Sequence, residues 1–253
     1  MPIRLLKLIS LICAFAVTLT ACGGGDSDNV DTAANTQPTE VATAADASLD
    51  DILATASSLI ANATSVHFTL KVEGDSFIDE GQLIRLLNAS GVLVRPDRVS
   101  TDFQVEVVGA GNISIKLITI GDQYWTTDIV TGRWTEAPEE FTYSPAKLFD
   151  TQQGIGPIMG KLADITLVGE EELGGRDTWK VTGTASEKDV SELTSDAMVG
   201  TSFPVTFWID RDSGELLQIV LAEPTDNGKD NPATWTMRLT DYNDDDVTID
   251  API

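Results

Sequence analysis

The chain has 253 residues and a formal net charge of −24, from 16 basic and 40 acidic residues. A surface this acidic repels phosphate backbones, so nucleic acid is not expected as a partner, and charge attraction to anionic headgroups does not explain any membrane association. Both cysteines, Cys13 and Cys22, lie near the start, and His67 is the single histidine. The body of the chain therefore offers no disulfide and little basis for a zinc site or a catalytic triad, and we expect no cofactor and no metal.

The first 21 residues have the layout of a bacterial secretory signal. Two basic residues precede an uncharged apolar run over residues 8–20, which is too short to span a membrane. The run ends in LTAC at residues 19–22, which resembles a lipobox, the motif at which the cysteine sulfur is lipidated and the chain is cleaved. We expect residues 1–21 to be a lipoprotein signal peptide and Cys22 to be a lipid anchor on the extracytoplasmic face of the cell membrane. An ordinary secretory signal with a chance cysteine is the alternative.

Residues 22–48 follow as a segment without aromatic residues, rich in small, polar and acidic ones. Such a segment buries too little apolar surface to fold, so we expect a flexible tether that spans roughly 25–30 Å. A folded domain is expected over residues 49–253. It begins with a helix over 49–62, because Ser48 suits an N-cap and apolar residues then recur at helical spacing.

Alternating apolar and polar residues predict strands in most of the remaining chain. In residues 65–74 and 98–109 the alternation is clear, and turn sequences at 121–122, 174–175 and 212–214 join further pairs. About nine or ten strands with short connections predict a mostly antiparallel sheet, and three short helical pieces at 144–150, 154–163 and 186–195 make the fold class α+β. Three glycines, Gly154, Gly156 and Gly160, favour loosely packed helical pieces that can shift.

Several stretches, in this order, resemble the LppX/LprA/LprF/LprG family of bacterial lipoproteins. They are SVHFTLKVEG (65–74), GVLVRPDRVSTDF (91–103), GDQYW (121–125), YSPAKLFD (143–150), LVGEEELGGRDTWKVTG (167–183) and PVTFWIDRDSGELLQIVL (204–221). The resemblance implies a LolA/LppX-like fold: a single curved, U-shaped (half-barrel), mostly antiparallel sheet with helices packed on its concave face. It also implies an apolar cavity for the acyl chains of a lipid or lipoglycan. Lipid carriage in the cell envelope, with an envelope transport protein as a further partner, would then be the function.

Apolar side chains of the helices and strands are expected to line that cavity. The candidates are Leu53, Leu59, Ile60, Phe68, Leu70, Phe103, Val105, Leu148, Phe149, Ile158 and Met159. If these residues instead fill the core, the domain would be an envelope protein-interaction module without a ligand. A third hypothesis is a hydrolase that uses paired carboxylates at residues 170–172, but adjacent acids on a hairpin are usually solvated. We therefore expect a binding protein and not an enzyme.

Overall fold

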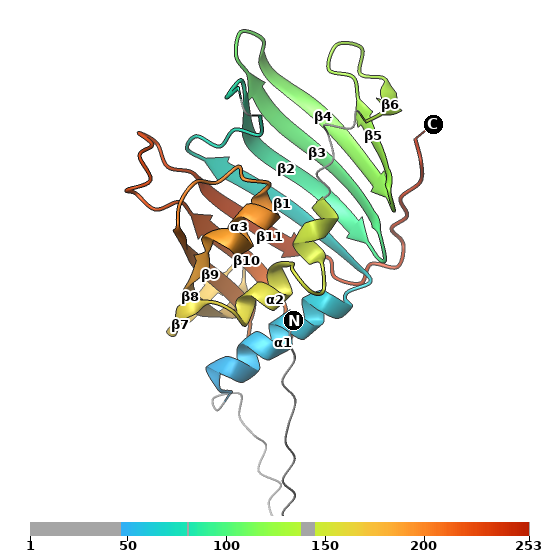
Figure 1. The fold of residues 1–253 in the computed structure, drawn as a ribbon. Helices are drawn as coiled ribbons and strands as arrows, with labels where there is room; N and C mark the ends of the chain where they lie inside the picture. Colours follow the sequence, from blue (N-terminus) through green and yellow to red (C-terminus); the bar gives the residue numbers. More distant parts are fainter. Residues whose placement is uncertain (1–46, 80, 138–144, 253) are drawn as a thin grey trace, which may run out of the picture. The chain divides into compact units, whose positions relative to one another are not determined.

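An open, curved antiparallel sheet of 11 strands dominates the structure (Figure 1). The computed structural model describes residues 47–79, 81–137 and 145–252, which belong to one compact unit. The strands are β1 Ser65–Glu73, β2 Ile84–Val94, β3 Arg98–Val107, β4 Gly111–Ile120, β5 Gln123–Thr127, β6 Trp134–Glu136, β7 Ala163–Leu173, β8 Arg176–Ser186, β9 Ser202–Asp210, β10 Leu216–Ala222 and β11 Thr234–Thr240. The helices are α1 Leu49–Asn62, the 3-10 helix η2 Pro145–Phe149, α2 Ile155–Met159 and α3 Glu187–Thr194. The predicted signal peptide, Cys22 and the tether up to residue 46 lie outside the described residues.

The strand order is β6-β5-β4-β3-β2-β1-β11-β10-β9-β8-β7. Almost every strand therefore pairs with its neighbour in sequence, and the exception is the central pair of β1 with β11, in which Leu70 lies opposite Met237. This pair joins an N-terminal half of the sheet to a C-terminal half. The prediction of a single curved, mostly antiparallel sheet is confirmed, because each pair of neighbouring strands in that order is antiparallel.

Helix α1 has the predicted bounds, and its start has the predicted cap. The side chain of Ser48 accepts a hydrogen bond of 3.2 Å from the backbone N–H of Asp51. Ser186 caps α3 in the same way, with 3.3 Å from the N–H of Asp189. Each cap pairs one of the N–H groups that a helix start leaves without an intrahelical acceptor.

Two strands, β2 and β6, were not predicted from the sequence. In β2 the register against β3 shifts between Leu86 and Asn88, so a bulge interrupts the alternation of apolar and polar residues in this strand. Strand β6 has only three residues, too few to show any period. By contrast, β1 buries Val66, Phe68 and Leu70 on one face as its alternation predicts.

The helical pieces pack closely on the rest of the core. Helix α2 packs against α1 and η2, η2 contacts β3, and α3 contacts β8 and β9. A Cβ on Gly156 would lie 3.0 Å from Cγ2 of Ile60 in α1, and one on Gly154 would lie 2.5 Å from the carbonyl oxygen of Asp150. These two glycines therefore permit close approach, which differs from the loose packing that the glycine spacing favoured.

Candidate functional site

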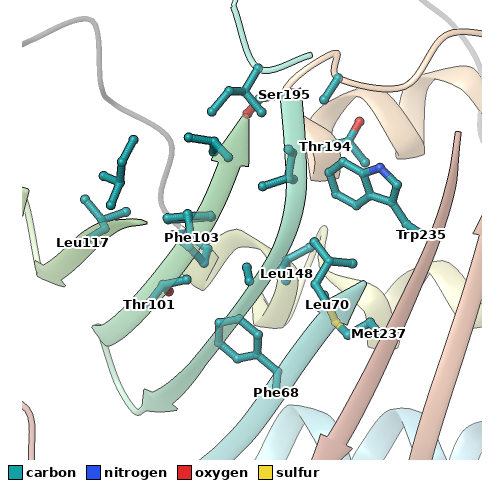
Figure 2. Close-up of a pocket in the computed structure, with 17 residues that line it drawn as sticks. Phe68, Leu70, Thr101, Phe103, Leu117, Leu148, Thr194, Ser195, Trp235 and Met237 are labelled. Carbon is teal, nitrogen blue, oxygen red and sulfur yellow. The ribbon is translucent and has the colours of Figure 1, made fainter. Parts of the chain in front are cut away.

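An apolar cavity of about 140 Å³ lies between one face of the sheet and the segments around η2 and α3 (Figure 2). Five neighbouring strands, η2, the loop between β1 and β2, and the segment over residues 194–197 contribute its walls. The lining residues are Phe68, Leu70, Ile78, Leu86, Ala89, Thr101, Phe103, Val105, Ile115, Leu117, Pro145, Leu148, Thr194, Ser195, Ala197, Trp235 and Met237.

The sheet wall consists of rows of residues that face each other across neighbouring strands. In one row Met237, Leu70, Ala89, Phe103 and Ile115 are successive partners from β11 to β4. Partners in an antiparallel pair point to the same face of the sheet, so a row of apolar partners makes a continuous apolar wall. The alternation of each strand and the registers between strands together produce the cavity wall.

A second row places a glycine beneath an aromatic ring. Gly91 lies opposite Phe68 on one side and Thr101 on the other. A Cβ on Gly91 would lie 2.7 Å from Cζ of Phe68 and 2.3 Å from the carbonyl oxygen of Ser100. Because Gly91 has no side chain, the Phe68 ring packs against the backbone of β2. The centroid of the Phe68 ring is 6.0 Å from that of the Phe149 ring.

Helix η2 closes the cavity opposite β3. Its side chains Pro145 and Leu148 line the cavity, whereas Phe149 points into the surrounding core. The guanidinium of Arg95, in the turn between β2 and β3, donates to the carbonyl oxygen of Phe149. This hydrogen bond holds η2 against the turn between β2 and β3, and so it positions the side chain of Leu148.

The lining carries almost no charge and few polar groups. Its polar residues are Thr101, Thr194 and Ser195, and the hydroxyl of Thr194 donates to the carbonyl oxygen of Val190 at 2.9 Å. The indole N–H of Trp235 donates to the hydroxyl of Ser76 at 3.2 Å. Trp235 therefore presents its apolar ring to the cavity while its one donor is paired elsewhere. Such a space suits hydrocarbon.

The structure places five of the eleven predicted cavity residues on the cavity wall. These are Phe68, Leu70, Phe103, Val105 and Leu148. Five others, Leu53, Ile60, Phe149, Ile158 and Met159, are buried in the core outside the cavity wall. The last, Leu59, is half-buried, and its Cδ1 would lie 3.3 Å from a Cβ placed on Gly214. α1 and α2 therefore fill the core beside the cavity, and η2, with the last residue of α3, supplies its helical wall.

Lining residues that the sequence analysis did not select come mainly from β2, β4 and β11. The alternation of Trp235, Met237 and Leu239 in β11, and of Ile115 and Leu117 in β4, carries the same signal as β1. That signal could have identified them. Ile78, Ser195 and Ala197 lie in loops, where no period exists, and only the tertiary structure brings them to the cavity.

On the opposite face of the sheet lies a second, polar depression of about 380 Å³. His67, Asp102 and Asp241 line it, and Nε2 of His67 is 3.7 Å from a carboxylate oxygen of Asp244. Among the described residues, no group of three or more histidine, cysteine or acidic side chains is arranged to hold a metal ion. Within the same residues, no helix is long and apolar enough to cross a membrane.

Comparison with known proteins shows the family. A sequence model of the LppX_LprAFG lipoproteins matches residues 47–249. The chain belongs to the LppX_LprAFG lipoprotein family. Lipoprotein LprA of Mycobacterium tuberculosis is 26% identical over 247 residues, which cover 93% of each chain. The lipoarabinomannan carrier protein LprG of M. tuberculosis is 22% identical over 173 residues, covering 63% of this chain and 71% of LprG.

Two solved structures of LppX_LprAFG lipoproteins share the fold. LprF from Mycobacterium bovis superposes with a TM-score of 0.63 at 18% identity, over 79% of this chain and 95% of LprF. LppX from M. tuberculosis has a TM-score of 0.55 at 19% identity, over 80% of this chain and 100% of LppX. The family resemblance inferred from the sequence is confirmed.

Proposed function

We propose that the protein is a membrane-anchored lipoprotein that binds the acyl chains of a lipid or lipoglycan in the apolar cavity and carries lipid in the cell envelope, without catalysing a reaction. The observation that carries the proposal is the lining, in which rows of apolar partners from β11 to β4 face η2. The name of LprG, a lipoarabinomannan carrier, supports a lipid with a carbohydrate headgroup as cargo. Helices on the concave side of the sheet, as the family resemblance implies, would enclose the chains.

The mechanism is partition of hydrocarbon between water and the cavity. Each buried methylene contributes about 0.8 kcal/mol, so even part of an acyl chain supplies useful affinity without any specific polar contact. Because the wall is apolar and nearly uncharged, it selects for hydrocarbon and leaves the headgroup outside. Release would follow contact with an acceptor surface or an envelope transport protein.

The small volume of the cavity favours the alternative function, an envelope protein-interaction module without a ligand. At about 140 Å³ it is smaller than the pockets of roughly 300–1,000 Å³ that hold drug-sized ligands. A full acyl chain therefore requires that η2 or α3 moves away from the sheet wall. If they do not move, the domain is an interaction module with a nearly filled core.

Uptake of a fluorescent fatty acid by the full chain separates these two functions. Ala89 is a small residue in the wall, so Ala89→Met would fill part of the cavity with a flexible apolar side chain. We expect saturable uptake by the unaltered protein and a clear loss of affinity in the variant. Ala54→Met, on the exposed side of α1, is the matched control and should bind normally. No uptake by the unaltered protein, together with a lipid-free mass in native mass spectrometry, would contradict the proposal.

A further inference from the structure

Exposed aliphatic side chains gather at one end of the sheet. Among the described residues, seven large hydrophobic side chains are exposed, and six of them lie in loops at the same end. They form what we call the apolar rim: Ile78, Leu83, Val108, Ile129, Val130 and Val199. The seventh, Val168, lies within the edge strand β7.

The strand registers show that these loops share one end. Glu73, the last residue of β1, lies opposite Thr234 of β11, and Ile84 of β2 lies opposite Val107 of β3. The loops that follow β1, β3 and β5 therefore project in one direction, as their tips do in the upper part of Figure 1. The loop between α3 and β9 is held to them, because Ser76 donates to the carbonyl oxygen of Ala197 at 3.3 Å.

The rim is continuous with the cavity. Ile78 of the rim also lines the cavity. Ser195 and Ala197, which line the cavity too, lie in the loop that carries Val199 of the rim. Helix α1 lies at the other end of the unit, because a Cβ on Gly214, in the turn between β9 and β10, would lie 2.7 Å from Cγ2 of Thr55 in α1. The rim therefore projects away from the point where the chain enters the domain.

The character of the rim side chains favours a lipid surface over a protein partner. Protein interfaces concentrate their binding energy in tryptophan, tyrosine and arginine, whereas all six rim residues are isoleucine, leucine or valine, spread over four loops. A lipid surface accepts separated aliphatic side chains without a complementary shape. The described charged residues in these loops are mainly acidic, and they are Asp75, Asp79, Asp128, Arg133 and Asp196. Acidic loops oppose contact with anionic headgroups.

From this arrangement we propose that the apolar rim inserts into a lipid surface of low negative charge and brings the cavity into contact with it. This interaction goes beyond the proposed cargo binding, because it concerns the surface on which the protein docks. It makes the rim the part of the folded domain that faces the membrane during lipid exchange.

Site-specific fluorescence quenching tests the rim. In the full chain, with both native cysteines replaced by Cys13→Ser and Cys22→Ser, a single cysteine is introduced by Val108→Cys, Val130→Cys or the control Val168→Cys, and labelled with a fluorophore. These positions are 67%, 86% and 57% exposed, so the label is tolerated at each. Vesicles of phosphatidylcholine with brominated acyl chains should quench positions 108 and 130 several-fold more than 168. Adding phosphatidylglycerol should reduce that quenching.

Two outcomes would overturn the proposal. One is equal or absent quenching at the three positions, as expected if the rim serves a protein partner. The other is stronger quenching with phosphatidylglycerol, which would reject a surface of low negative charge. Fatty-acid uptake is measured on the same labelled proteins, so uptake without quenching rejects the rim alone, and quenching without uptake rejects the acyl cavity alone.

Discussion

Nη2 of Arg95 donates a hydrogen bond of 2.8 Å to the carbonyl oxygen of Phe149, the last residue of η2. The same guanidinium donates to the carbonyl oxygens of Ile60 at 3.0 Å and Ala63 at 2.8 Å, where α1 ends. Burial lowers the pKa of Arg95, and the charge of Asp150 opposes this effect. One side chain in the β2–β3 turn thus pairs carbonyls of two helical segments that would otherwise lack intrahelical donors.

Removing the Arg95 guanidinium should destabilise the domain and loosen η2. For Arg95→Met we expect a loss of about 2–4 kcal/mol in the free energy of unfolding, since three carbonyls lose charged donors. Urea denaturation measures the loss, and hydrogen exchange of η2 shows whether the helix loosens. Lys188→Met, which removes an exposed positive charge on α3, is the control and should change stability little. Equal effects of the two substitutions would mean that Arg95 does not hold η2.

Adding a methyl group at Gly91 should be costly. The new Cβ would overlap the Phe68 ring and the Ser100 carbonyl, and the backbone cannot yield without breaking the ladder between β2 and β3. We expect Gly91→Ala to lower stability by at least about 2 kcal/mol. At Gly160 the nearest atom to a new Cβ is 3.8 Å away, so Gly160→Ala should be tolerated. Similar melting temperatures for both variants would contradict the proposed close approach.

The carboxylate of Glu223 is fully buried and joins the loops near the rim. It accepts hydrogen bonds from Nζ of Lys229 at 2.6 Å and from the backbone N–H groups of Val199 and Ala233, each at 2.7 Å. Glu223→Ala leaves these donors unpaired, so a loss of about 3–5 kcal/mol is expected.

An exposed ion pair provides the comparison for Glu223. Lys71 and Glu73 are 2.9 Å apart, but their side chains are 67% and 61% exposed. Glu73→Ala should therefore change the free energy of unfolding by at most about 1 kcal/mol. If both glutamate variants show the same small change in urea denaturation, Glu223 does not organise the loops.

The ion pair of Asp210 with Arg176 should make stability depend on pH. Burial alone would raise the pKa of Asp210, but the N–H and hydroxyl of Ser213 and the Arg176 guanidinium, 2.6 Å away, outweigh burial and lower the pKa below its usual value. An aspartate with a lowered pKa in the folded state stabilises the fold above its unfolded pKa of about 3.9 and loses this contribution as pH falls through the folded pKa.

The loss of stability caused by Arg176→Gln should therefore be smaller in acid than at neutral pH. The variant is expected to be less stable than the unaltered protein at pH 6, and the difference should shrink as the pH falls below about 4. Urea denaturation at several pH values measures it. A difference that stays constant down to low pH would show that this pair does not set the acid sensitivity.

The predicted lipid anchor depends on one sulfur atom. Cys22→Ser removes the acceptor for lipidation, so we expect the protein to leave the membrane fraction and to lose incorporation of a labelled fatty acid. Cys13→Ser, within the predicted signal peptide, should change neither result. Continued labelling of the Cys22→Ser protein would reject the anchor.

The sequence alone determined the type of fold and the local limits of several elements. Helix α1 and its Ser48 cap were predictable because capping and 3.6-residue spacing are local properties. Alternation likewise identified β1 and β3, and with them four of the five predicted residues found on the cavity wall, since a period of two decides which side chains share a face.

Only the tertiary structure decided which apolar residues line the cavity and which fill the core. Leu70 and Ile60 look equally apolar in sequence, but the registers between strands place Leu70 on the wall, and the close approach at Gly156 buries Ile60 between α1 and α2. The bulge in β2 interrupts its alternation, so the sequence did not predict this strand. Ile78 lines the cavity from a loop, where no period exists. Contacts between distant segments depend on how complete strands pair and helices pack, and no local pattern of residues specifies that geometry.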